Sequence, residues 1–192
     1  MGKIEKPKKS KLIISIIANK EIMFENAKSL LIDEFGDIDN ESDYQSFDYT
    51  SYYEKEMGSN LLQKLVSFNK LISPGLLSRI KHKTNKMEMI LSFDEIKNNN
   101  DNLKNIKNND IKRKVNLDPG YLTLSKFILA STKNGPARIY LNNGIYAEIT
   151  LSFIKKSFCA VEWTYKNYQT PEYIYFLNNI RENYKREISV IN

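Results

Sequence analysis

The sequence is poor in the side chains that close disulfides and hold metal ions. Its 192 residues include one cysteine, Cys159, and one histidine, His82. One cysteine forms no internal disulfide, and one of each falls short of the four ligands of a structural zinc site. A Ser-His-Asp triad would need His82, which stands between two lysines in a helical pattern, where we expect a surface position. We expect Cys159, beside Phe158 near a strand end, to be a small buried apolar residue.

Long apolar runs are also missing, and none approaches the roughly 20 residues that span a bilayer. Residues 1–11 carry five lysines and one glutamate, and a short apolar run, 12–18, follows them. This start resembles a signal peptide, but no small-residue cleavage site follows it. We interpret residues 1–11 as a basic flexible tail that leads into a buried strand. This predicts a cytoplasmic protein with no membrane partner.

Two standard phosphate-binding loops, G-x-x-x-x-G-K-[ST] and G-x-G-x-x-G, are absent from the sequence. The net charge of +6 is weak evidence for a nucleic-acid partner, because residues 1–11 supply +4 of it. A nucleic-acid footprint requires charge gathered on one face. What the chain does have is a hydrophobic content of 41% and an aromatic content of 11%. These values predict one globular domain over residues 12–192.

The chain in order predicts strands that alternate with helices. The β-branched run 12–18 is typical of a strand buried on both faces, and Asn19 and Gly36 suit the start and the end of a helix. Ser73-Pro74 suits the start of a second helix that runs to about Phe93. Further strands are expected at 44–49, 62–68, 112–117 and 158–161, with a hairpin at 138–151, a closing helix from Thr170-Pro171, and a low-complexity surface insertion at 97–110.

The segment that begins at Asp118-Pro119-Gly120 has two interpretations. Asp then Pro suits the start of a helix, whereas Pro then Gly suits a type II turn. A helix would place Lys126, Ala130 and Lys133 on one face. A strand would separate polar from apolar side chains poorly, so we favour a helix over 119–131.

The hairpin at 138–151 permits a sharper prediction. A two-residue Asn143-Gly144 turn would mix polar and apolar residues on each face. A three-residue loop, 142–144, is the next common class and pairs Arg138 with Glu148. Because burial of one face fixes the register, we predict the longer loop. Its apolar face would contain Ile139, Leu141, Ile145, Ala147, Ile149 and Leu151, and its other face Arg138, Tyr140, Tyr146, Glu148 and Thr150.

The element order predicts the fold. Strand–helix–strand followed by strand–helix–strand is the split βαβ, or ferredoxin-like, pattern. We therefore expect an α+β domain with a mainly antiparallel sheet. A C-terminal β-meander should extend this sheet, a closing helix should follow, and the helices should pack largely on one face.

Residues 113–150 contain the most distinctive set of polar side chains. Cations that fix an anion, beside carboxylates that contact its polar groups, predict a site for a small anionic ligand, phosphorylated or nucleotide-like. In the alternative interpretation Arg138 and Glu148 are a cross-strand pair, Asp118 is a cap and the lysines are solvated. On the second helix, Asn85 and Glu88 can reach the same site. The candidate ligand-binding residues are Arg113, Asp118, Tyr121, Lys126, Lys133, Arg138, Tyr140, Tyr146 and Glu148.

Residues 37–58 hold seven carboxylates against one lysine, together with five aromatic residues. They are either a metal or ligand loop that uses Asp48 and Glu54 beside the aromatic faces of Tyr49 and Tyr53, or a solvated acidic loop anchored by its tyrosines. Because the loop is acidic where 113–150 is basic, we hypothesise that it closes over that site. RNA or a protein, bound through basic and tyrosine-rich surfaces, is the alternative partner. No cofactor, reaction or oligomeric state follows from the sequence.

Five blocks of the sequence together resemble one family, the prokaryotic domain of unknown function 4416. They are F-D-Y-T-S-Y-Y-E-K-E-M-G, V-S-F-N-K-L-I-S-P, V-N-L-D-P-G-Y-L-T-L-S-K-F-I-L-A-S-T-K, R-I-Y-L-N-N-G-I-Y-A-E-I-T-L and W-T-Y-K-N-Y-Q-T-P-E-Y. The basic tail and the Asn-rich insertion depart from the family pattern. The resemblance implies a single-domain prokaryotic protein and supplies no activity, ligand or catalytic residue.

Overall fold

An open antiparallel sheet organises the chain in the structure, a computed structural model that describes residues 2–50, 52–99 and 112–191. Among the described residues nine strands pair in the order β2-β4-β1-β5-β6-β8-β7, with β3 also on β4 and β9 also on β8. The strands are β1 (Lys11–Ala18), β2 (Ile38–Glu41), β3 (Gln45–Ser46), β4 (Leu62–Phe68), β5 (Val115–Leu122), β6 (Lys126–Ser131), β7 (Arg138–Asn142), β8 (Ile145–Ile154) and β9 (Ser157–Ala160). The helices are α1 (Glu21–Phe35), α2 (Glu54–Met57), α3 (Leu77–Asn99) and α4 (Pro171–Ile191), with 3-10 turns at Pro74–Leu76 and Lys166–Gln169.

The first part of the sheet confirms the split βαβ prediction. Strands β2, β4, β1 and β5 lie side by side in that order, and each neighbouring pair is antiparallel. Helices α1 and α3 make the two crossovers. The second strand lies earlier than expected, because 38–41 rather than 44–49 forms most of it, with only Gln45–Ser46 pairing as β3. The Asp39 carboxylate, which accepts a hydrogen bond from Ser67 of β4, holds β2 in place.

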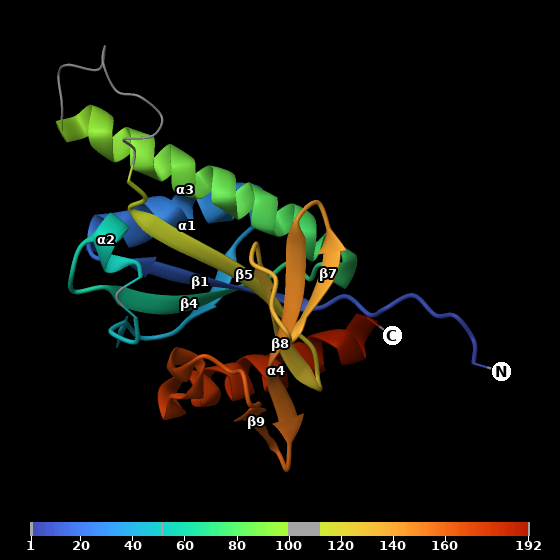
Figure 1. Cartoon of the computed structure of the whole chain (residues 1–192). Coiled ribbons are helices and arrows are strands. Elements are labelled where there is room, and N and C mark those ends of the chain that lie inside the picture. The colour runs from blue at the N-terminus through green and yellow to red at the C-terminus, as the bar shows by residue number, and fades with distance from the viewer. Residues whose placement is uncertain (1, 51, 100–111, 192) are drawn as a thin grey trace.

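Both faces of β1 are buried, as its β-branched sequence predicts. Leu12, Ile14 and Ile16 face the core under α1 and α3, whereas Ile13 faces a second core under α4. Figure 1 shows α1 and α3 on one side of the sheet and α4 on the other. One-sided packing therefore holds for α1 and α3 only. No helix among the described residues is long and apolar enough to cross a membrane.

Residues 119–131 are not a helix. Val115–Leu122 and Lys126–Ser131 are two strands that pair around a tight turn, in which Thr123 N donates to Lys126 O at 2.9 Å. Gly120 permits this pairing, since a Cβ at that position would lie 2.3 Å from the Ile128 carbonyl oxygen. The strand β5 lies between β1 and β6 and is largely buried, so its sequence lacks the alternation of a half-exposed strand.

The predicted pairs of the β7–β8 hairpin are confirmed, with Arg138 opposite Glu148 and Tyr140 opposite Tyr146. The loop is shorter than predicted, because Asn142 pairs with Ile145 around Asn143-Gly144 and an irregularity between Tyr140 and Asn142 shifts the register. The burial of the hairpin differs only in part from the prediction, since Ile145 and Leu151 are buried as expected. Ile139 is 70% exposed on the edge strand, whereas Glu148 is 6% exposed. Leu141 and Ile149 are exposed as well, and Thr150 is buried. The polar face of β8 is covered because residues 163–164 lie across it, where Trp163 Nε1 donates to Ile149 O and Thr164 Oγ1 donates to Thr150 O.

The ends of the predicted elements are partly corrected. Lys11, placed in the tail, begins β1 and is buried, and the basic residues before Ser10 are exposed. The N-cap of α1 is Lys20 instead of Asn19, whereas Gly36 ends this helix as expected, with a φ of 90°. Thr170 Oγ1 accepts from Tyr173 N at the start of α4, as predicted. Residues 97–99 of the expected insertion belong to α3, and 100–110 lie outside the described residues.

His82 is exposed, as expected, and its Nε2 lies 2.9 Å from Asn143 O. Cys159 is half-buried rather than part of the core. Its Sγ lies near the carbonyl oxygens of Ile154 and Ser157 in the β8–β9 hairpin.

Candidate functional site

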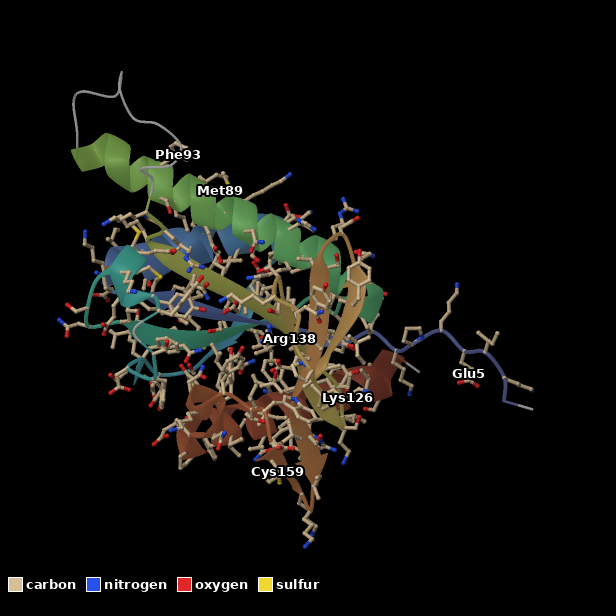
Figure 2. The ribbon with its side chains drawn as sticks, viewed as in Figure 1. Glu5, Met89, Phe93, Lys126, Arg138 and Cys159 are labelled. Carbon is tan, nitrogen blue, oxygen red and sulfur yellow. The ribbon has the colours of Figure 1, made fainter. Side chains whose placement is uncertain are left out.

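A cavity of about 810 Å³ is lined by residues of strands from β4 to β8 and of the segments beside them. Segment 47–53, helix α3, strands β5 and β6, the loop before β7, and residues 162–168 contribute to its wall. In Figure 2, Arg138 of this wall lies near the middle of the molecule, between α3 and α4. The cavity therefore collects residues that are far apart in the sequence.

One end of the cavity is a network of charged residues from α3 and β5. Lys81 Nζ donates to Asp118 Oδ1 at 2.8 Å and to Leu117 O at 2.9 Å. Asn116 Nδ2 donates to Asp118 Oδ2 at 2.6 Å and Arg113 donates to Asn116 Oδ1 at 2.8 Å. Burial acts to raise the pKa of Asp118, but the Lys81 ammonium and its hydrogen bond outweigh burial and hold that pKa below its ordinary value. Asp118 is therefore ionised in the cavity at neutral pH.

Glu88 belongs to the same network and has a different proton affinity. It is 8% exposed, and its Oε1 accepts a hydrogen bond from Leu117 N at 2.7 Å. Burial raises the pKa of Glu88 to about 7, although Lys81 at 4.0 Å and Arg113 at 3.7 Å oppose the shift. A carboxyl group that titrates near neutral pH is suited to accept or donate a proton, and such groups gather at functional sites.

The other end of the cavity is built around Arg138 and Glu148. Arg138 Nε donates to Glu148 Oε2 at 2.8 Å, its NH1 donates to Lys133 O at 2.8 Å, and its NH2 donates to the Tyr165 hydroxyl. Three acceptors thus hold one planar guanidinium. The second carboxylate oxygen of Glu148 is buried and accepts no hydrogen bond from the described residues.

Aromatic side chains form much of the remaining wall. Lys133 Nζ lies 4.1 Å from the ring centroid of Tyr52, and the Arg113 guanidinium lies 5.0 Å from that of Tyr53. Burial, followed by the nearby Asp118 charge, raises the pKa of the Tyr53 hydroxyl, so this group remains protonated. Tyr49 and Tyr52 are about half exposed, as are Trp163 and Tyr165 on the other segment. Segment 47–53 therefore borders the same cavity as the basic residues of 113–150.

An amide chain reaches the floor of the cavity. Asn167 Nδ2 donates to Gln63 Oε1 at 3.0 Å, and Gln63 Nε2 donates to Ser15 Oγ at 2.7 Å. Both amides are buried. This chain fixes residues 166–168 against β4 and β1, and so positions the wall that carries Trp163 and Tyr165.

Comparison with known proteins identifies the family. A model of the family described as Domain of unknown function (DUF4416) matches residues 8–184. The chain belongs to this family. All residues that line the cavity lie within the matched range. No curated protein and no solved structure matches the chain.

The cavity brings together seven of the residues predicted from the sequence. They are Arg113, Asp118, Lys133, Arg138, Glu148, Tyr49 and Tyr53. Tyr49 and Tyr53 of the loop thus border the same cavity as the basic segment, and the closure of the loop over the site stays a prediction.

Six predicted residues lie outside the cavity wall. Lys126 pairs with Ser152 at the far end of β6, and Tyr121 packs against the core under α3. Tyr140 and Tyr146 form an edge-to-face pair, with ring centroids 5.4 Å apart, further along the β7–β8 hairpin. Asp48 and Glu54 are exposed. The ligand interpretation of loop 37–58 therefore rests on those of its tyrosines that line the cavity. In the described part of the chain no three His, Cys, Asp or Glu side chains are grouped to hold a metal ion.

Asn85 and Glu88, which the sequence places within reach of the site, line the cavity as well. Sequence reasoning misses several other residues of the wall. Lys81 occupies the same face of α3 as Asn85 and Glu88, at i, i+4 and i+7, and this polar row on a core-facing helix is the available signal. Asn116, with its buried amide between Arg113 and Asp118, gives no comparable signal. Other residues of the wall lie on segments whose proximity depends on the tertiary structure, among them Gln63, Trp163, Tyr165, Lys166 and Asn167.

Proposed function

We propose that the cavity binds a small anionic molecule, phosphorylated or nucleotide-like. The observation that carries the proposal is the convergence of five cationic side chains with exposed aromatic rings in one cavity. Its volume of about 810 Å³ lies within the roughly 300–1,000 Å³ of small-molecule sites. The five cations are Lys81, Arg113, Lys133, Arg138 and Lys166.

The cations divide into two groups. Lys81, Arg113 and Arg138 are held by carboxylates, which fix their positions. Lys133 and Lys166 form no ion pair with a carboxylate in the described parts of the chain, so their ammonium groups are available to an anion. Arg138 uses three of its five N–H groups in the contacts above, and two remain to donate to phosphate oxygens.

The aromatic residues account for the ring that we assign to the ligand. Tyr52 on one side and Trp163 and Tyr165 on the other each expose about half of their surface. Aromatic faces stack on sugars and bases, and stacking on a base contributes about 1–3 kcal/mol. A phosphate near Lys133 and a ring near these faces use both properties of the cavity.

A binding screen tests the proposal. Phosphorylated sugars, nucleotides and inorganic phosphate are added to the protein, and the melting temperature and Trp163 fluorescence are recorded. Trp163 is the chain's one tryptophan and lines the cavity, so its emission reports occupancy. We expect saturable stabilisation by at least one phosphorylated compound.

A double variant, Lys133→Ala with Lys166→Ala, should weaken that binding tenfold or more, on the order of 1.4 kcal/mol. The matched control is Lys86→Ala with Lys185→Ala, which removes two exposed lysines outside the cavity. Equal affinity in the two double variants would show that the lysines of the cavity do not hold the anion.

RNA or protein binding is the alternative function. Its specific support is the exposure of Tyr49, Tyr52, Trp163 and Tyr165 at the cavity, since such rings also stack on single-stranded bases. An affinity that falls steeply with rising salt concentration indicates contacts with many phosphates, and would favour RNA over a small molecule. The cytoplasmic location and the prokaryotic source stay predictions.

A further inference from the structure

The Glu148 carboxylate is only half used by the protein. Its Oε2 accepts a hydrogen bond from Arg138, whereas its buried Oε1 accepts none from any described residue. Glu148 is 6% exposed and lines the cavity. A buried carboxylate oxygen without a donor is rare in native proteins, because burial removes the water that would hydrate it. Because Glu148 lines the cavity, a donor bound there can reach its carboxylate.

The neighbouring groups keep this acceptor available. Arg138 is fixed by Lys133 O and Tyr165 as well as by Glu148, so its guanidinium has one orientation. Rotation of the carboxylate only exchanges its two oxygens. One of them therefore has no donor from the described residues in either position.

We propose that Glu148 selects ligands that place a hydrogen-bond donor, a hydroxyl or an N–H group, beside a phosphate-bearing ring. The inference rests on the proposed function, because it assigns the part of the ligand that the cations do not hold. A site built to receive a donor discriminates strongly against an analogue that lacks it, since the analogue leaves the buried oxygen unpaired. The donor has two chemical sources, a sugar hydroxyl and a nucleobase N–H.

The first experiment uses the wild-type chain and Trp163 fluorescence. The probes are inorganic phosphate, ribose 5-phosphate, nucleoside 5′-monophosphates, their 2′,3′-dideoxy forms, and forms with methylated base nitrogens. Removing the donor that Glu148 receives should lower affinity at least about tenfold. Loss with the dideoxy forms identifies a sugar hydroxyl, and loss with the methylated bases identifies a base N–H.

The second experiment uses Glu148→Gln. The glutamine carbonyl would accept from Arg138 and leave the amide NH₂ at the position of Oε1, which replaces an acceptor by a donor. We expect the donor-bearing probe to bind at least about tenfold more weakly, and the probe without the donor to bind as well as it does to wild type or more tightly, because a negative charge is removed from the cavity. Glu162→Gln is the matched control, because it removes the same charge from an exposed residue of the same cavity. It should bind phosphate-bearing probes equally well or more tightly.

The outcomes separate the two proposals. If no phosphorylated probe changes the fluorescence of the wild type, both are wrong. If Glu148→Gln binds the two probes as the wild type does, Oε1 is satisfied by solvent alone, and this inference is wrong while the proposed function stands. If the variant does not fold, the wild-type comparison decides, since equal affinity for the donor-bearing and donor-lacking probes overturns the inference.

Discussion

Glu88 and Lys11 are both buried ionisable residues, but their surroundings differ. Glu88 has its two cationic neighbours at 3.7 and 4.0 Å, and burial dominates. Lys11 is fully buried, and its Nζ lies against the carboxylates of Asp39 and Glu187, the latter at 2.7 Å. The ionised form of Glu88 therefore opposes folding. The ion pairs of Lys11, by contrast, connect β1 to β2 through Asp39 and to α4 through Glu187.

The first prediction concerns Glu88→Gln. Because the folded state raises the pKa of Glu88 from 4.5 to about 7, it binds more protons than the unfolded state between these values. Stability should then fall as the pH rises from about 4.5 to 7. The amide carries no charge and its oxygen can still accept from Leu117 N. The variant should be more stable than the wild type at pH 8, by up to about 3 kcal/mol, and similar to it at pH 4. Denaturant titrations at the two pH values measure this, and a constant difference would contradict it.

The second prediction concerns Lys11→Met, which keeps the apolar stem and removes the ammonium. Asp39 and Glu187 would lose their partner, at a cost near the lower end of roughly 3–5 kcal/mol because both carboxylates are partly exposed. Burial acts to raise the pKa of Asp39, but the hydrogen bonds from Lys11 and Ser67 outweigh burial and hold this pKa below its ordinary value. This contribution is present above the unfolded pKa of 3.8 and is lost as the pH falls through the folded pKa. The difference in stability between wild type and variant should therefore become smaller at acidic pH. Thermal melts at several pH values measure this difference.

At the scale of elements, the pairing of strands β5 and β6 requires the backbone of Gly120 to lie close to the Ile128 carbonyl oxygen. The third prediction is that Gly120→Ala destabilises the protein by about 1–3 kcal/mol or more, since the added Cβ would meet the Ile128 carbonyl at 2.3 Å. Gly75→Ala is the control, because its Cβ would find no atom closer than 3.8 Å. Chemical denaturation compares the two. Equal stabilities would show that the β5–β6 pair separates without cost.

The β8–β9 hairpin turn places two lysines, Lys155 and Lys156, at φ values of 49° and 71°. Such a turn favours Asn-Gly, because glycine carries no Cβ and asparagine tolerates the left-handed region. The fourth prediction is that Lys155→Asn with Lys156→Gly stabilises the chain by about 0.5–2 kcal/mol. Lys155→Gln with Lys156→Gln removes the same charges and keeps the backbone strain, so it should bring no such gain in melting temperature. If both double variants raise the melting temperature equally, the effect comes from the lost charges and not from the backbone, and the prediction is wrong.

At the scale of the whole molecule, β1 belongs to both cores. Leu12, Ile14 and Ile16 face the core under α1 and α3, and Ile13 faces the core under α4, so both cores include the same strand. The fifth prediction is that Leu177→Ala, which empties a fully buried site on α4, lowers stability by about 2–5 kcal/mol and keeps one unfolding transition.

Calorimetry, far-ultraviolet circular dichroism and Trp163 fluorescence should report the same midpoint for Leu177→Ala. Tyr175→Ala, at a position 70% exposed on the same helix, should change the midpoint little. An early transition of α4 alone, seen by only one of these methods, would contradict the shared role of β1.

The sequence by itself determined much of the fold. The buried run at 12–18, the glycine at 36 and the Thr170-Pro171 pair are local signals, and each led to the correct element. The cross-strand pairs of the β7–β8 hairpin followed from matching side chains across a loop of a few residues, because strand pairing between close neighbours depends on local geometry. The same reasoning named Arg138 and Glu148, and the structure joins them at 2.8 Å.

Only the tertiary structure decided which faces are covered. The strand β5 is largely buried, and the polar side of β8 is covered by residues that lie more than ten positions away in sequence. Alternation along a strand shows that two faces differ but not which one a distant segment covers. For this reason the sequence wrongly predicts a helix over 119–131, and it misplaces the burial of part of the hairpin, such as Ile139, Glu148 and Thr150. Lys81 and Glu88, Gln63 and Trp163 join the candidate site because long-range packing of α3, β4 and residues 162–168 brings them to one cavity.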